Sequence, residues 1–219
     1  MSTPPRRVRL GALALAVAGG LFILYPAVRP WHDESTVDGA TASMSSPAWV
    51  AAHFFAMLGF IAVPLGLLAL RSVVAGTRGE PVAAAAVVVS WIGAGLTLPY
   101  YGAEDFALNA IARRAGAGHL DLLDLVGAIR YSPLAITTFG IGLAALGAGA
   151  VLAAVAVGRS GRLPRWSGIP FAVGFVLLIP QFFAGAAVRI GHGVLVAIAL
   201  GWLASVLWSA AGRDRATTA

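Results

Sequence analysis

The chain of 219 residues contains no cysteine and no lysine, because all fifteen of its basic residues are arginine. The absence of cysteine excludes disulfide bonds, thiolate metal sites and a cysteine nucleophile, and it leaves the redox compartment of the protein undetermined. The absence of lysine excludes chemistry through a Schiff base. Any binding or catalysis must therefore use other side chains.

Charge is also scarce. Charged residues make up 11% of the chain, hydrophobic residues make up 59%, and the mean hydropathy is +0.86. A chain of this length cannot bury so much apolar surface inside a soluble fold, so it must use lipid as its solvent. The formal net charge is +6, but the arginines are scattered among short connections and form no basic stripe, which argues against nucleic acid as a partner. The composition indicates an integral membrane protein whose main partner is the lipid bilayer.

Six segments are long and apolar enough to cross a hydrocarbon core of about 30 Å, which takes about 20 helical residues. They lie near residues 8–29, 49–70, 82–101, 133–157, 168–188 and 193–211. Arg6, Arg7 and Arg9 precede the apolar run of the first segment, and basic residues before an apolar run are also typical of a signal peptide. This apolar run is long and no clean cleavage site follows it, so we expect a retained helix. The sequence therefore predicts an all-α bundle of six transmembrane helices that forms one domain over residues 1–219.

The distribution of arginine predicts the orientation of these segments by the positive-inside rule. Ten of the fifteen arginines fall at the two chain ends, between the second and third segments, or between the fourth and fifth. These parts carry a net charge of +8, whereas the alternate connections carry −2. We therefore expect a bacterial plasma-membrane protein with both termini in the cytoplasm. All four histidines and seven of the nine carboxylates then fall on the outer side.

The first outer connection, residues 31–47, is rich in serine, threonine, aspartate and glycine. This composition predicts an irregular cap over the mouth of the bundle. Trp31 and Trp49 bracket the connection, and we expect both to act as anchors at the membrane interface.

The second outer connection, residues 102–132, shows two helical patterns. In the first, Asp105, Asn109 and Arg113 recur at four-residue spacing and predict a polar stripe that either lies along the interface or extends the third span. A hinge is expected at Gly116–Gly118. Residues 119–130 then predict a second short amphipathic helix. Its apolar positions are Leu122, Val126 and Ile129. One or two interfacial helices here could form a lid, or they could be a solvated connection.

Eight residues near the outer ends of the predicted spans are candidates for a ligand-binding cavity. His53 lies one turn below Trp49 in the second span, and His192 opens the sixth span at a similar depth. Glu104 and Asp105 follow the third span and could supply oxygen ligands or proton acceptors. The candidate set is His53, Tyr100, Tyr101, Glu104, Asp105, Gln181, Arg189 and His192.

A structural interpretation competes with this site. Near the headgroups, a histidine can hydrogen-bond to water and an arginine can extend to the interface, so neither requires a ligand. Glu104 and Arg189 could equally form a structural ion pair. His32 and His119 are loop residues without a spaced partner, and they stay outside the candidate set.

Three functions follow from these residues. The favoured one is non-enzymatic: binding or passage of a small solute or ion, for which we expect a homodimer because six spans are few for a monomeric transporter. The second is a redox or enzyme subunit that binds a divalent metal or haem through His53 and His192, with Glu104 as a base or third ligand. No HExxH or HxH motif supports it. The third is an accessory subunit that docks another membrane protein.

Two stretches carry a resemblance to a known group. SPAWVAAHFFAMLGF (residues 46–60) and YYGAEDFALNAI (residues 100–111), in a chain rich in alanine, arginine and glycine, resemble small, uncharacterised six-span membrane proteins of high-GC actinobacteria. The resemblance implies an integral membrane protein and places His53 and Glu104 in the stretches that characterise the group. It implies no activity and no catalytic residues.

Overall fold

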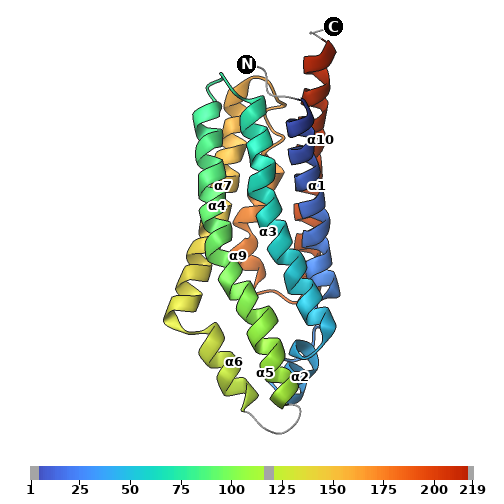
Figure 1. The fold of residues 1–219 in the computed structure, drawn as a ribbon, viewed down its shortest axis with the longest axis vertical. Helices are drawn as coiled ribbons and strands as arrows, with labels where there is room; N and C mark the ends of the chain where they lie inside the picture. Colours follow the sequence, from blue (N-terminus) through green and yellow to red (C-terminus); the bar gives the residue numbers. More distant parts are fainter. Residues whose placement is uncertain (1–4, 116–120, 217–219) are drawn as a thin grey trace.

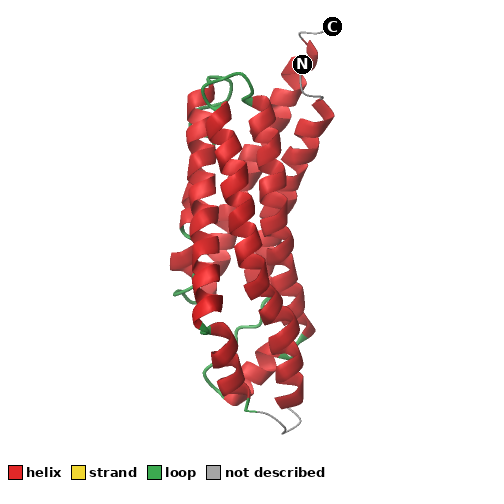
Figure 2. Cartoon of the chain, turned by 60° about the vertical axis from the view of Figure 1, so that its left-hand side comes forward, coloured by secondary structure: helices red, strands yellow, loops and turns green. Residues whose placement is uncertain are grey.

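The computed structural model describes residues 5–115 and 121–216, and the chain within them is helical, without a strand (Figure 2). Five helices in the described residues are long and apolar enough to cross a membrane. The predicted all-α class is therefore confirmed. The elements in chain order are α1 (Pro5–Val28), α2 (Val37–Met44), α3 (Pro47–Val73), α4 (Glu80–Gly102), the π-helical turn η1 (Ala103–Leu108), α5 (Asn109–Ala115), α6 (Leu122–Arg130), α7 (Pro133–Ser160), α8 (Ile169–Val176), α9 (Leu178–Gln181) and α10 (Ala186–Ala216).

The long helices run side by side in an elongated bundle (Figure 1). α1 packs between α3 and α10, α4 packs between α3 and α7, and α8 lies between α7 and α10 and closes the ring. Edge-to-face contacts inside the ring join Phe22 to both Phe60 and Phe175. These rings are 5%, 1% and 1% exposed, respectively, so aromatic side chains fill the middle of the bundle.

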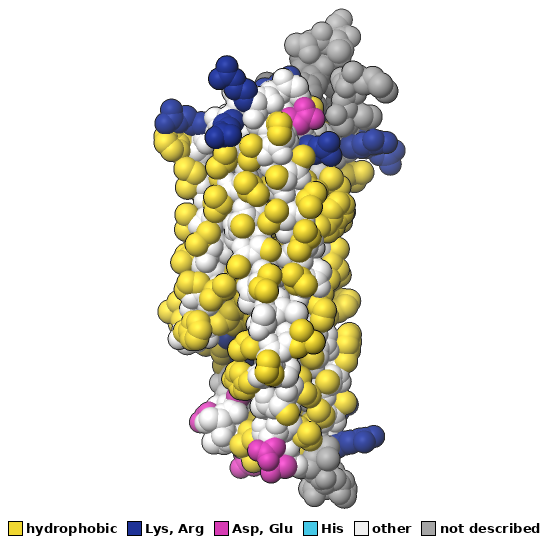
Figure 3. Space-filling model, turned by 90° about the vertical axis from the view of Figure 1, so that its left-hand side faces the viewer, with side chains coloured by type: hydrophobic (Ala, Val, Ile, Leu, Met, Phe, Trp, Pro, Cys, Tyr) yellow, Lys and Arg dark blue, Asp and Glu magenta, His cyan; other side chains and the backbone are white. Residues whose placement is uncertain are grey.

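The two ends of the bundle differ in charge. Both chain ends lie at one end, here called the termini end, whereas α2, α5 and α6 lie at the opposite end, here called the cap end (Figure 1). On the face shown in Figure 3, arginine gathers mostly at the termini end and acidic side chains mostly at the cap end, with an apolar surface between them. This is the surface that a helical bundle needs in order to sit across a bilayer.

The segment 168–188, predicted as a continuous fifth span, forms the two short helices α8 and α9 instead. Pro180 has no N–H to donate to the carbonyl of Val176, so a continuous helix is interrupted at Leu177. α10 then begins at Ala186 rather than near residue 193. The predicted count of six uninterrupted spans is therefore not confirmed, and Arg189 belongs to the first turn of a long helix rather than to a connection.

The helix of the third predicted span does not stop where α4 ends, at Gly102. It continues through the π-helical turn η1 into α5, as one of the two alternatives predicted. A π turn accommodates one extra residue, which rotates the side chains that follow. Asp105 is consequently buried beside α3, Asn109 donates to the Met44 carbonyl at 2.7 Å, and Arg113 is exposed. The prediction that these three residues form one polar stripe is wrong.

The connection 31–47 is more ordered than predicted, since it contains the helix α2. The Thr36 hydroxyl accepts a hydrogen bond from the Gly39 N–H at 3.1 Å and caps this helix. The predicted amphipathic helix in the second connection is present as α6. The predicted hinge at Gly116–Gly118 and His119 lie outside the described residues.

Close packing of α4 against α7 leads to a first prediction. A Cβ atom added to the buried Gly93 would lie 2.7 Å from the Leu146 nitrogen and 2.8 Å from the Gly142 oxygen, both backbone atoms that cannot yield locally. We expect Gly93→Ala to destabilise the protein by about 1–3 kcal/mol, measured by unfolding in mixed micelles. Gly95→Ala, on the exposed face of the same helix with no atom within 4 Å, is the control and should be neutral or stabilising. Equal effects would show that this helix contact is loose.

Candidate functional site

An open cavity of about 650 Å³ lies toward the cap end. Its walls come from the end of α1 and the following loop, and from α3, α4, η1, α6, α7, α9 and α10 together with the turn between these last two. Five of the eight predicted residues line it. They are His53, Tyr100, Tyr101, Glu104 and Arg189.

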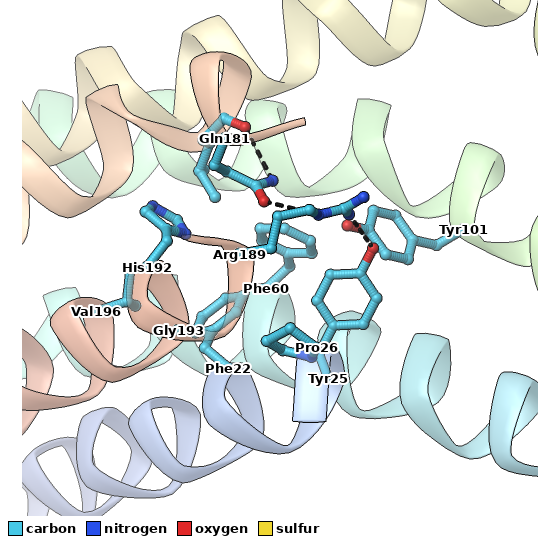
Figure 4. Close-up of a pocket in the computed structure, with 11 residues that line it drawn as sticks. Phe22, Tyr25, Pro26, Phe60, Tyr101, Gln181, Arg189, His192, Gly193 and Val196 are labelled. Carbon is cyan, nitrogen blue, oxygen red and sulfur yellow. Dashed lines mark hydrogen bonds between the residues drawn. The ribbon is translucent and has the colours of Figure 1, made fainter. Parts of the chain in front are cut away.

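A small chamber shares wall residues with the cavity and is lined by two of the three remaining candidates (Figure 4). Its volume is about 20 Å³, which is room for about one water molecule. Gln181 and His192 line this chamber, and Tyr25, Tyr101 and Arg189 line both spaces. Phe22 and Phe60 of the aromatic cluster line the chamber, and neither of them lines the larger cavity.

An ion-pair chain spans one wall of the cavity. Arg130 of α6 donates from Nε and Nη2 to the two carboxylate oxygens of Glu104, each at 2.7 Å, and from Nη1 to Glu34 at 2.8 Å. Glu34 also pairs with Arg29. The predicted Glu104–Arg189 pair is wrong, because Glu104 is engaged by Arg130 instead. Two arginines and two glutamates balance one another in this wall.

The protonation of Arg130 reflects that arrangement. Burial by itself lowers the pKa of the guanidinium, but the hydrogen bonds and charges of Glu104 and Glu34 outweigh it and raise the pKa above its ordinary value. Arg130 is therefore charged at any physiological pH. It holds α6 to η1 and to the loop after α1 through charge-assisted hydrogen bonds.

Arg189 is buried and has only neutral partners among the described residues. It donates from Nε to the Gln181 side-chain oxygen and from Nη2 to the Tyr25 hydroxyl, each at 3.1 Å (Figure 4). The guanidinium also lies 5.0 Å from the centre of the Trp31 ring and 4.8 Å from that of Phe182. These contacts stabilise the guanidinium but leave its charge uncompensated.

His53 and Asp105 form a second buried group next to the cavity. The Trp49 carbonyl lies 2.9 Å from His53 Nδ1, and because a carbonyl only accepts, this nitrogen carries the hydrogen. Asp105 Oδ1 lies 3.9 Å from the same nitrogen, and neither carboxylate oxygen of Asp105 has a hydrogen-bond partner in the described part of the chain. Asp105 does not line the cavity, so its predicted role as a direct ligand-binding residue has no geometric support.

The two predicted histidine ligands do not converge. His53 lines the cavity, whereas His192 lines the small chamber and its Nε2 lies 2.8 Å from the Gly174 carbonyl. Glu104, the predicted third ligand, is held by Arg130. No group of three histidine, cysteine, aspartate or glutamate side chains suited to a metal ion occurs within residues 5–115 and 121–216. This arrangement does not favour a metal or haem site.

Sequence reasoning missed several residues of the wall. Arg29 and Glu34 belong to the loop between α1 and α2 whereas Arg130 ends α6, and no spacing along the chain indicates that Arg130 meets Glu34 and Glu104. The ring of Trp31, predicted at the membrane interface, lies 4.5 Å from the Arg29 guanidinium and 5.0 Å from that of Arg189. The one available signal was the position of Arg130 at the end of a predicted lid helix.

Comparisons with protein-family models, with curated proteins and with solved structures return no match. The fold and site define a helical bundle with five candidate membrane-spanning helices and a polar cavity near one end. Any function must therefore be argued from the cavity.

Proposed function

We propose that the protein is a multi-pass protein of the bacterial plasma membrane that binds a small solute in the cap-end cavity, and that this cavity faces outward. The positive-inside rule supports the orientation. Eight arginines with described side chains belong to the termini end, against a single described carboxylate, Glu80. The termini end is then cytoplasmic.

A sixth crossing, made by α8 and α9, completes this topology. α7 ends at the termini end, and α10 both starts toward the cap end and returns to the termini end (Figure 1). The segment between them must bring the chain back through the bundle. Discontinuous helices of this kind line substrate sites in several transporter folds, because the broken backbone exposes polar groups at mid-membrane depth.

The observation that carries the proposal is the cavity itself. Its volume of about 650 Å³ falls within the range of small-molecule sites, about 300–1,000 Å³, and such sites combine apolar walls with a few convergent polar groups. Here aromatic rings such as Phe139 and Phe182 share the wall with Tyr25, Arg189 and the ion-pair chain. Binding needs only this conformation. Passage across the membrane additionally requires the aromatic cluster around Phe22 to move.

The absence of cysteine makes a direct test simple, because each introduced cysteine is the only thiol. Gly140 lines the cavity, and a Cβ atom added to it would meet no other atom within 4 Å, so Gly140→Cys should fit. We expect a membrane-impermeant maleimide to label Gly140→Cys from outside intact cells. Labelling requires water at the thiol, since the thiolate is the reactive form.

Two control variants accompany Gly140→Cys. Gly20 lies on the exposed face of α1 and also has no atom within 4 Å, so Gly20→Cys should face lipid and stay unlabelled. Arg78→Cys, in the exposed connection after α3, should react only after the membrane is permeabilised. Unlabelled Gly140→Cys in intact cells, with Arg78→Cys labelled after permeabilisation, would refute the outward-facing cavity.

A further inference from the structure

Of the three arginines that line the cavity, one lacks an ionic partner. Arg29 and Arg130 pair with Glu34 and Glu104. Arg189 makes no ion pair within the described part of the chain, and its Nη1 makes no hydrogen bond there. The residue is only 9% exposed, and charged side chains buried to this extent are normally paired.

No carboxylate with a described side chain forms an ion pair with Arg189. Glu34 and Glu104 are engaged by the ion-pair chain, and Asp105 lies outside the cavity. Asp33 is exposed, and its Oδ1 accepts from the Ser35 hydroxyl and N–H. Asp214, whose side chain is not described, is 25 residues along the same helix, or roughly 37 Å at 1.5 Å per residue.

The surroundings of Arg189 favour an anion further. It lies in the first turn of α10, a helix of 31 residues with no acidic residue in that turn. The positive end of the helix dipole therefore adds to the guanidinium. Tyr25 and Gln181 hold Arg189 at the junction of the cavity and the small chamber (Figure 4). Its orientation is thus set by neutral groups, which leaves the charge available.

We propose that this inner end of the cavity is an anion-binding site, and that the solute is a small organic anion whose carboxylate binds Arg189. The inference rests on the proposed function and specifies its ligand class. The apolar body of the anion would contact Trp31, Phe139 and Phe182, which line the same cavity. A carboxylate matches the planar guanidinium donor geometry, and it supplies the missing negative charge.

Thermal unfolding of the purified protein with paired probes tests this assignment. The probes are acetate, butyrate, benzoate and phenylacetate, each compared with its neutral amide at constant ionic strength. We expect at least one carboxylate to raise the melting temperature of the wild-type protein while its amide does not. Arg189→Gln should bind that carboxylate about 10- to 100-fold more weakly, the usual effect of losing a hydrogen bond to a charged group.

Two further variants separate the site from general charge and folding effects. Arg113→Gln removes an exposed arginine of the cap end and should bind as the wild type does. Arg189→Lys keeps the charge and should retain part of the affinity. Without any probe, Arg189→Gln should be as stable as the wild type or more so, because it removes an uncompensated buried charge. A strongly destabilised Arg189→Gln would mark Arg189 as a structural residue and overturn the proposal.

The anionic group could also come from a lipid, so short-chain dihexanoyl phosphatidylglycerol is included as a probe. Stabilisation by this lipid alone, lost in Arg189→Gln, keeps the anion site and assigns its source to a headgroup. Amides that bind as well as their carboxylates, or no stabilisation by any anionic probe, would overturn the anion assignment. Either result can occur with Gly140→Cys still labelled from outside, so it would leave the outward-facing cavity standing.

Discussion

Trp49→Ala is expected to destabilise the cap end by about 3–5 kcal/mol, the usual range for truncating a buried tryptophan. Trp49 is fully buried within a second hydrophobic cluster formed by α2, α3, η1, α5 and α6. Its Nε1 donates to the Glu104 carbonyl at 2.9 Å, and the Arg29 guanidinium lies 4.7 Å from its ring centre. The alanine variant therefore loses core volume, a hydrogen bond and a contact of the ion-pair chain together.

Hydrogen exchange of the purified protein measures this effect by region. Protection from exchange should fall in α2, α5 and α6, which share a hydrophobic cluster with Trp49. It should persist in α1 and α10, which contribute to the separate, larger hydrophobic cluster of the bundle. Trp91→Ala is the matched control, since Trp91 is 48% exposed on the surface of α4. Equal loss of stability in the two variants would contradict a separate core at the cap end.

Arg130→Met is expected to release the helix α6 from the bundle. The substitution leaves the Glu104 carboxylate buried without a cation, and breaking a buried pair in this way typically costs about 3–5 kcal/mol. We expect roughly 3 kcal/mol, at the lower end, because the side chain of Glu34 is 19% exposed and also keeps Arg29 as a partner. Faster hydrogen exchange in α6 (Leu122–Arg130), together with a lower unfolding temperature, would report the change.

A double variant separates the ion pair from the contacts of the arginine stem. In Arg130→Met with Glu104→Leu, no buried carboxylate is left unpaired, so most of the lost stability should return. Arg114→Met, an exposed arginine of α5, should have little effect. A double variant as unstable as Arg130→Met would show that the apolar stem of Arg130, rather than its charge, holds α6 to the bundle.

Features that depend on local sequence agree best with the structure. Long apolar runs predicted helices in the places of α1, α3, α4, α7 and α10, because a lipid-facing helix must be apolar along its whole length. The spacing of Leu122, Val126 and Ile129 predicted α6 for the same local reason. Pro180 indicates that the helix is interrupted near Leu177. The high hydropathy of residues 168–188 favours a continuous span instead, and the structure shows the interruption.

The sequence predicts most residues that line the candidate site, but it does not predict which of their charged groups pair with one another. His53, Tyr100, Tyr101, Glu104 and Arg189 were placed near one mouth from their depth in the predicted spans, and they line one cavity. Depth carries no information about the direction in which a side chain points around its helix. Both carboxylates lie in the π turn at Ala103–Leu108, where Glu104 meets Arg130 whereas Asp105 lies beside His53 without a hydrogen-bond partner among the described residues.

The sequence by itself determined the helical class, the apolar spans and the unequal distribution of charge between the two ends, because each depends on residues close together in the chain. The tertiary structure alone decided which charges neutralise one another. Arg130 pairs with Glu104, which is 26 positions away in the sequence, and with Glu34, which is 96 positions away. Among the residues that the structure describes, Arg189 is thereby left with neutral partners only. The uncompensated charge at the inner end of the cavity is thus a property of the packing, since pairing in a low-dielectric interior depends on distances between atoms and not on composition.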